Sequence, residues 1–407
     1  MRPRLRLSRP FWLDRETTAP RFPSLRGDHT ADIVVVGGGG TGAAIAWRFA
    51  SAGLRVVVLE AERVGRGSTA ASTALLMQEP DVDLGELARR YGLARARRVW
   101  ELSRDATREL VSSIRGLRID CDLAQHDSVY YALTRDAAAG LRREHDRRSR
   151  AGIRGRWLDR ARLRRDTGIA GAAAIRTHGN AVVDPYRCCL GFIGAARAAG
   201  ADVFERSPVR TVDASAAGVR VRTDRACVRA DRAIVATGYA TPYFEPLAAR
   251  FRMMHTYVTA TRPLTRAERE RVGLGPLMIW ETGRPYHYGR WTPDGRLMLG
   301  GGDRTRVRER DRRRAFAAGA MRVLDYFVER FPMLADVTID YAWEGLFVMT
   351  PDGLPYIGPH RRYPRQLFAL GYGGNGMTLG FLASRLLLDW HAGRRTADHT
   401  LFGFTRA

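Results

Sequence analysis

The sequence contains no lysine, so all 67 of its Lys and Arg positions are arginine. With 43 acidic residues the formal net charge is +24. The arginines are spread along the whole chain, and even their densest cluster, residues 304–314, contains Glu309 and Asp311. Such one-sided use of arginine is typical of GC-rich coding. It predicts a solvated surface with weak attraction to acidic partners, and nucleic acid is not expected as a partner.

Long apolar runs and cysteine pairs are also missing. Runs such as Ala43–Trp47 are far shorter than the roughly 20 residues of a membrane span. The basic first residues lack the apolar stretch of a secretion signal. The four cysteines form no CxxC, and no His, Asp or Glu spacing indicates a metal site. With 45% hydrophobic residues the chain can bury a large core, so these features predict a folded protein of the reducing cytoplasm.

One βαβ unit is indicated near the start of the chain. Ile33–Val36 is a β-branched run that predicts a buried strand. Small apolar residues over Ala43–Ala52 predict a helix that ends at Gly53, and Val56–Leu59 predicts a second buried strand. These elements follow one another within about 30 residues, which is the length of a dinucleotide-binding unit.

The turn after the first strand carries the spacing G-x-G-x-x-G. Gly37 allows a tight turn, Gly39 lets the backbone approach a diphosphate, and Gly42 permits close packing of helix on strand. Glu60 ends the second strand, where its carboxylate can accept the hydroxyls of an adenosine ribose and disfavours a 2′-phosphate. The sequence therefore predicts a dinucleotide site, with an empty glycine-rich turn as the alternative.

Three further segments favour FAD over NAD. Residues 64–74 are rich in Gly, Ser and Thr, which suits a loop along an extended dinucleotide. Short strands are expected over 201–238. The strand Leu367–Leu370 runs into the glycine-rich residues 371–378, and a helix is expected over Leu379–Trp390. The start of that helix can face the electron-rich edge of a flavin.

The chain has no second G-x-G-x-x-G of this quality, which argues against a separate NADPH domain.

These motifs resemble the FAD-dependent D-amino-acid oxidase family, which includes glycine and sarcosine oxidases, D-amino-acid dehydrogenases and polyamine-pathway oxidases. The likeness spans about residues 30 to 395, and its most specific part is TPDGLPYIGP followed by GYGGNGM. It implies an α/β fold: a two-dinucleotide-binding-domain (Rossmann-like) FAD domain with a discontinuous α+β substrate domain on a mixed sheet. The expected FAD domain comprises 28–100, 166–244 and 338–407. The expected substrate domain comprises 101–165 and 245–337, after an N-terminal extension, 1–27.

The resemblance also implies which residues bind non-covalent FAD. They are Gly37, Gly39, Gly42, Glu60, Arg66, Ser68, Thr69, Val209, Thr237, Gly238, Asp352, Gly373, Gly374, Asn375, Gly376 and Met377. Asp352 belongs to the TPD turn that the family places beside the flavin.

The implied reaction is hydride transfer from an amine carbon to flavin N5, which gives an imine that hydrolyses. The chain departs from the family where some members anchor a substrate carboxylate with arginine, because Phe347 stands there. Gly345 occupies the position of the cysteine that attaches flavin covalently in the sarcosine-oxidase branch. The lysine by which that branch activates oxygen is absent. A substrate other than an α-amino acid, and either oxygen or a quinone- or dye-type acceptor, therefore remain open.

The substrate side is expected around Trp280–Trp291. On a strand, Tyr286, Tyr288 and Arg290 share one face, with His287 and Trp291 on the other. The first three are candidates for an aromatic pocket wall with one arginine, or else they pack the domain core. His255 is a further catalytic candidate that could equally be a buried core histidine.

Two other functions share the predicted fold. One is a tRNA-base-modifying flavoprotein, which the net charge of +24 supports and the absence of a partner domain weakens. The other is a flavin-binding protein without amine turnover. A quinone acceptor would imply weak peripheral contact with a membrane. The identity of the amine and the oligomeric state are not determined by the sequence.

Overall fold

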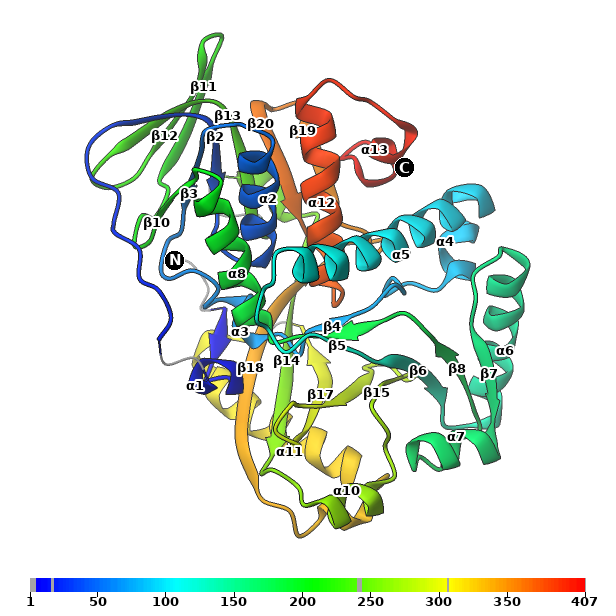
Figure 1. Ribbon diagram of the computed structural model, residues 1–407. Helices are drawn as coiled ribbons and strands as arrows, with labels where there is room; N and C mark the ends of the chain where they lie inside the picture. The colour runs from blue at the N-terminus through cyan, green and yellow to red at the C-terminus, as the bar shows by residue number, and fades with distance from the viewer. Residues whose placement is uncertain (1–4, 16–17, 240–243, 306, 407) are drawn as a thin grey trace.

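Two large sheets dominate the computed structural model, which describes residues 5–15, 18–239, 244–305 and 307–406 (Figure 1). The first has eight strands. Its parallel part runs β10-β3-β2-β13, with β20 also parallel to β13, while β12 and β11 extend β13 as an antiparallel hairpin and β19 pairs with β20. The strands are β2 (His29–Val36), β3 (Val56–Leu59), β10 (Asp202–Phe204), β11 (Thr211–Ser215), β12 (Gly218–Arg222), β13 (Cys227–Gly238), β19 (Tyr356–His360) and β20 (Tyr363–Leu370).

Side-chain alternation on β2 builds two cores, one on each face of this sheet. Ile33 and Val35 pack with the helices α2 (Gly40–Ser51), α5 (Leu93–Gly116), α8 (Pro185–Ala198) and α12 (Gly376–His391). Val34 and Val36 pack instead against the layer that contains β11 and β12. Both faces of the strand are therefore buried, which explains its continuous β-branched run.

The second sheet has nine strands in the order β1-β18-β14-β17-β16-β15-β6-β8-β7 and is antiparallel except for β15 beside β6. Its strands are β1 (Arg6–Leu7), β6 (Asp127–Ala132), β7 (Arg156–Asp159), β8 (Ala173–Thr177), β14 (Arg252–Thr261), β15 (Leu277–Glu281), β16 (His287–Trp291), β17 (Leu297–Arg304) and β18 (Ile339–Met349). The helix α11 (Arg312–Val328) packs on one face through Val323 and Phe327.

Smaller elements connect these layers. A three-stranded sheet joins β4 (Leu75–Leu76), β9 (Ala181–Val182) and β5 (Ala124–Gln125). The remaining helices are α1 (Phe11–Arg15), α3 (Ser68–Ala71), α4 (Leu84–Tyr91), α6 (Arg135–Arg150), α7 (Arg160–Thr167), α9 (Glu245–Ala248), α10 (Arg266–Val272) and α13 (Ala397–Phe402), with 3-10 turns η2 (Glu309–Asp311) and η3 (Pro332–Leu334).

The predicted βαβ unit is present as β2, α2 and β3. The strand Val56–Leu59 has the expected bounds, whereas α2 begins at Gly40, three residues before the expected start. Gly39 is its N-cap, so two glycines, Gly40 and Gly42, lie inside the first turn of the helix. The predicted C-terminal strand and helix correspond to β20 and α12, and each extends further than expected.

The expected domain boundaries cut across the second sheet. β8 and β18 fall inside segments that were expected in the FAD domain, yet both belong to the nine-stranded sheet. β18 does so because it pairs with β14 along almost its whole length. The proposed division into domains stays a prediction.

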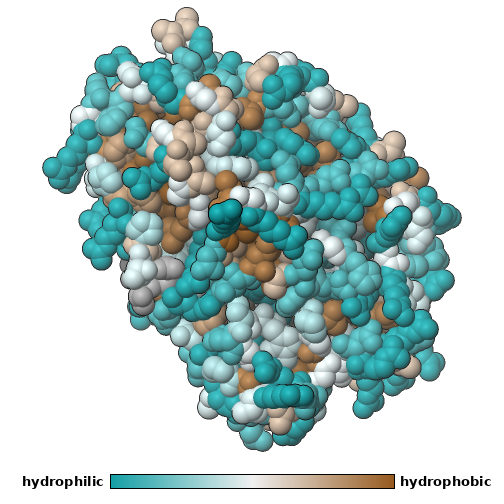
Figure 2. All heavy atoms as spheres, in the orientation of Figure 1, coloured by the Kyte–Doolittle hydropathy of each residue, from teal (hydrophilic) through white to brown (hydrophobic). Residues whose placement is uncertain are grey.

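The surface is largely polar. Figure 2 shows hydrophilic residues over most of the viewed face, with hydrophobic residues reaching it only in patches. Many arginines of the chain pair with acids, for example Arg98 with Asp398 and Arg394 with Asp389. In the part of the chain that the structure describes, no helix is long and apolar enough to cross a membrane.

Candidate functional site

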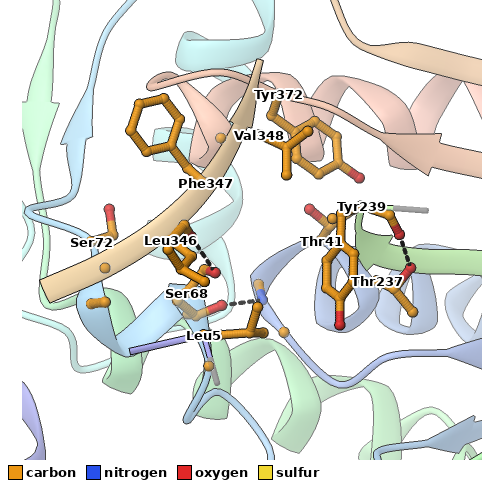
Figure 3. Close-up of a pocket in the computed structure, with 18 of the residues that line it drawn as sticks. Leu5, Thr41, Ser68, Ser72, Thr237, Tyr239, Leu346, Phe347, Val348 and Tyr372 are labelled. Atoms are coloured by element: carbon orange, nitrogen blue, oxygen red, sulfur yellow. Dashed lines mark hydrogen bonds between the residues drawn. The ribbon is translucent and has the colours of Figure 1, made fainter. Parts of the chain in front are cut away.

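A cavity of about 590 Å³ lies where the carboxyl ends of β2, β3 and β13 approach the nine-stranded sheet. This edge of a parallel sheet is where α/β folds bind nucleotides, and the volume is in the usual range of ligand pockets. Fourteen of the sixteen predicted FAD residues line it: Gly37, Gly39, Glu60, Arg66, Ser68, Thr69, Val209, Thr237, Gly238, Gly373, Gly374, Asn375, Gly376 and Met377. Figure 3 shows part of this lining.

The first glycine loop leaves no room for side chains. Gly37 has a φ of +110°, and a Cβ on it would lie 2.7 Å from the carbonyl oxygen of Ala236. A Cβ on Gly42 would lie 1.9 Å from the carbonyl oxygen of Gly37, so Gly42 contributes by close packing outside the cavity. The N-cap Gly39 offers no side-chain cap to α2. Apart from the N–H of Gly40, which the Thr69 hydroxyl accepts, the start of α2 can offer backbone N–H groups to a diphosphate.

Glu60 lies at the end of β3 and organises this loop. Its carboxylate accepts the backbone N–H of Gly38 at 2.7 Å and that of Glu62 at 2.9 Å. A carboxylate oxygen can accept more than one hydrogen bond, so Glu60 can still accept ribose hydroxyls. The geometry fits the role expected from the motif.

The residues after β3 cross the cavity towards β18. The Thr69 hydroxyl accepts the N–H of Gly40 at 3.0 Å. The Ser68 hydroxyl donates to the carbonyl of Leu346 at 2.6 Å (Figure 3). On the opposite wall, the Thr237 hydroxyl donates to the carbonyl of Tyr239 at 2.7 Å. These bonds fix the positions of the hydroxyl groups that line the cavity.

The C-terminal glycine loop closes the other end. The N–H of Gly373 donates to the carbonyl of Val348 at 3.0 Å, and the N–H of Gly374 donates to the carboxylate of Asp81. The amide of Asn375 donates to the carbonyls of Met77 at 2.8 Å and Glu79 at 3.0 Å. These bonds hold the start of α12 against the segment that follows β4.

The two glycine loops face each other. A Cβ on Gly40 would lie 3.5 Å from the sulfur of Met377, although the two residues are far apart in the sequence. One ligand can therefore touch both helix starts, α2 and α12. A flavin dinucleotide bound here would have its diphosphate held by the start of α2 and its isoalloxazine ring by the start of α12.

Tyr286 and Tyr288 line the cavity near the second loop. A Cβ on Gly374 would lie 2.7 Å from the Tyr286 hydroxyl, and the Tyr288 hydroxyl lies 3.1 Å from that of Thr256. Burial raises the pKa of both tyrosines, so both hydroxyls stay protonated. As expected from strand alternation, His287 points the other way and stacks on Tyr326, with ring centroids 3.7 Å apart.

Besides Gly42, three predicted site residues lie outside this lining. Arg290 shares the face of Tyr288 but lies further along β16, where it donates to the carbonyl of Val183 at 2.7 Å and covers the Trp12 ring. His255 is buried against Glu344, which also binds Arg312 at 2.8 Å. These partners explain why neither side chain reaches the cavity.

Asp352 is the third. Instead of lying beside the cavity, its carboxylate binds the Arg406 guanidinium at 2.6 Å and accepts hydrogen bonds from Tyr91 at 2.5 Å and Thr350 at 3.0 Å. Although burial opposes ionisation, Arg406 holds the pKa of Asp352 at about 2. The TPD turn is thereby tied to the C-terminal end of the chain.

Trp280, from the expected substrate segment, joins the tyrosines in the lining. Three further lining residues, Glu79, Asp81 and Thr256, are not expected from the sequence. Burial raises the pKa of Asp81. Burial also raises the pKa of Asp303, which neighbours Thr256, to about 7. Glu79 and Asp81 belong to no motif, and only their place directly after β4 brings them to the site.

Comparison with known proteins identifies the family. Residues 32–390 match the family model described as FAD dependent oxidoreductase. The chain is 29% identical to gamma-glutamylputrescine oxidoreductase of Escherichia coli (strain K12), over 90% of this chain and 85% of that protein. It is 28% identical to glycine oxidase of Bacillus licheniformis, over 88% of this chain and 92% of that protein. The crystal structure of glycine oxidase from Geobacillus kaustophilus superposes with a TM-score of 0.78 at 22% sequence identity. The match covers 93% of this chain and 99% of that chain.

The predicted α/β fold class and FAD as the cofactor are thereby confirmed. The glycine loops without side chains, the Glu60 carboxylate and the paired helix starts fit this cofactor. The chain belongs to the D-amino-acid oxidase family of FAD-dependent oxidoreductases.

Proposed function

We propose that this FAD-dependent oxidoreductase oxidises the C–N bond of an amine whose recognition does not require a carboxylate. Phe347 lines the cavity at the position where some family members have a carboxylate-binding arginine. The relatives named above act, by their names, on gamma-glutamylputrescine and on glycine. In gamma-glutamylputrescine the putrescine amine is far from the glutamyl carboxylate, whereas in glycine the carboxylate is next to the amine carbon. With Phe347 in place of an arginine, an amine of the first kind is the better model for the substrate of this chain.

The distribution of charge in the cavity carries this proposal. Its lining arginines within the described residues are Arg63 and Arg66, in the loop after β3, and Arg6, on β1 opposite Gly345. The end formed by the C-terminal glycine loop has the acids Glu79 and Asp81. Glu79 is held by Ser128 and Asn180, and Asp81 accepts the N–H of Gly374. Arg284 lies over the Tyr286 ring at 5.3 Å but outside the lining, so the acids are the charged groups of the lining itself at this end. An acidic, aromatic lining can attract an ammonium group.

The residues of this chain bind and orient the amine, and they exclude water. Tyr286, Tyr288 and Trp280 supply an apolar wall in which an amine can lose its proton, because burial disfavours the charged form. Bound FAD would accept the hydrogen and the two electrons of the C–H bond next to the amine nitrogen. We propose that Tyr286 and Tyr288 contact the substrate. We propose that the fourteen predicted FAD residues that line the cavity contact FAD.

The remaining assignments are also proposals. The acceptor of the electrons is either oxygen or a quinone- or dye-type compound, and weak membrane contact would go with a quinone. All four cysteines are free thiols, which supports a cytoplasmic location. Gly345 at the position of the attaching cysteine supports non-covalent FAD.

The test uses the visible spectrum of the purified protein. Acid precipitation should release its FAD. Under anaerobic conditions, amines are then added in matched pairs that differ only in a carboxylate, such as putrescine and ornithine. We expect the amine of a pair to bleach the flavin band faster than its acid. Faster bleaching by the amino acid would refute the proposal, and no bleaching by any amine would favour a flavin-binding protein without turnover. Re-oxidation by air or only by a dye separates oxidase from dehydrogenase.

A further inference from the structure

The N-terminal segment, expected as an extension, is part of the nine-stranded sheet. β1 pairs antiparallel with β18, with Arg6 opposite Gly345 and Leu7 opposite Glu344. The N–H of Leu346 donates to the carbonyl of Leu5 at 2.9 Å. These bonds place the first described residues directly beside the strand that borders the cavity.

The helix α1 anchors this segment. Trp12 is fully buried, and its indole N–H donates to the carbonyl of Ser72 at 2.8 Å. Phe11 is also buried in the same cluster, which includes Trp343 of β18. The segment is therefore held by the residues that surround the cofactor cavity.

Leu5 and Arg6 form part of the cavity wall. Figure 3 shows Leu5, Ser68 and Leu346 side by side, although they come from three distant parts of the sequence. A Cβ on Gly67 would lie 2.9 Å from the Leu5 side chain, so β1 lies directly against the loop that follows β3. This loop carries Arg66 and leads to Thr69, which contacts the first glycine loop.

Arg6 brings a second cation to this part of the cavity. Its Nε donates to the carbonyl of Arg66 at 2.9 Å, and another nitrogen donates to the carbonyl of Ser8 at 2.8 Å. Burial and the neighbouring Arg66 both lower the pKa of Arg6. Within the described residues, neither guanidinium has a carboxylate at ion-pair distance. Two crowded, partly desolvated cations are stabilised by an anion between them.

We propose that Arg6 binds the diphosphate of FAD together with Arg66, and that β1 closes the diphosphate end of the cavity. Guanidinium groups form directed, charge-assisted hydrogen bonds with phosphate oxygens. The helix start of α2 approaches the diphosphate from one side and Arg6 approaches it from the N-terminal strand. The N-terminal segment is then a cofactor-binding element of this chain.

The experiment measures the dissociation constant of FAD for the full-length apoprotein over a range of salt concentrations. Arg6→Gln should weaken FAD binding by about 10-fold or more. It should also flatten the dependence of log Kd on log salt, because one charge contact with phosphate is lost. Arg9→Gln is the matched control. It removes the same charge a few residues away, where Arg9 is exposed and pairs with Asp14, and it should change neither quantity.

Two results would overturn the proposal. The first is an unchanged Kd for FAD in Arg6→Gln. The second is a larger Kd for FAD in Arg6→Gln with the same salt dependence as in the unchanged protein. That result would mean that Arg6 only holds β1 in place. Arg6→Lys provides a further check, because it retains the charge and should keep most of the salt dependence.

Discussion

The guanidinium of Arg406 binds both carboxylate oxygens of Asp352, at 2.6 and 3.0 Å, and so fixes the C-terminal end of the chain to the turn after β18. Both side chains are almost fully buried. Arg406 also donates to the carbonyls of Leu354 and Pro355. The pair therefore supports the strand β18, which borders the FAD cavity, from outside the site.

Replacing Arg406 should give a pH-dependent loss of stability. At pH 7, Arg406→Gln leaves a buried carboxylate without its cation and should lower the free energy of unfolding by about 3 kcal/mol. The pKa of Asp352 is below its ordinary value, so the pair stabilises the protein above about pH 4, and this stabilisation is lost as the pH falls towards 2.

Urea unfolding at pH 7 and at pH 3 tests this expectation, and the difference between the two proteins should narrow at the lower pH. Arg394→Gln removes an exposed partner of Asp389 and should cost less than about 1 kcal/mol at either pH. A constant difference for Arg406→Gln across this range would contradict the assigned ion pair.

Gly42 should tolerate no side chain. In Gly42→Ala the added Cβ would meet the carbonyl oxygen of Gly37 at 1.9 Å, so helix α2 must move away from β2. We expect a loss of about 3 kcal/mol or more in unfolding free energy, and incomplete FAD content. Gly194 on α8 is the matched control, because nothing lies within 4 Å of its added Cβ. Gly194→Ala should be neutral or stabilise by up to about 1 kcal/mol. Equal stability of both variants would refute this packing role.

The tyrosine hydroxyls should affect turnover and leave cofactor binding unchanged. Tyr286→Phe and Tyr288→Phe each remove a hydroxyl from the flavin end of the cavity and should lower kcat/KM about 10-fold for the best amine, with an unchanged Kd for FAD. Tyr363→Phe, on β20 and outside the cavity lining, should have no effect on either. Unchanged kcat/KM in both cavity variants would show that these tyrosines only pack the wall.

Asp303 should make the protein less stable as the pH rises. Burial raises its pKa to about 7, so the folded state holds a proton that the unfolded state releases near pH 4. The folded state therefore loses stability between about pH 4 and 7, by up to about 4 kcal/mol. Asp303→Asn removes this loss and should be relatively more stable at pH 8 than at pH 4. Thermal unfolding at both values checks this, with the exposed Asp231→Asn as control. If the stability of Asp303→Asn and that of the unchanged protein vary with pH in parallel, Asp303 does not have a raised pKa in the folded state.

Local motifs made the cofactor half predictable. The strand, the glycines, the helix and Glu60 lie within about 30 residues, so their relative positions follow from one βαβ unit. Alternation along a strand likewise placed Tyr286 and Tyr288 on one face and His287 on the other. In both cases the geometry depends on neighbours in the chain.

Contacts between distant residues decided the rest. Asp81 lies in the cavity lining, where its carboxylate accepts the N–H of Gly374, 293 positions later in the sequence. Asp352 lies outside the lining, where its carboxylate binds Arg406. Arg6 enters the cavity only through the pairing of β1 with β18. By itself, the sequence determined the family, the cofactor and the loop that receives the diphosphate, because those signals are local and sterically specific. Only the tertiary structure decided which charges surround the substrate, because side chains far apart in sequence meet there only after the two sheets have packed.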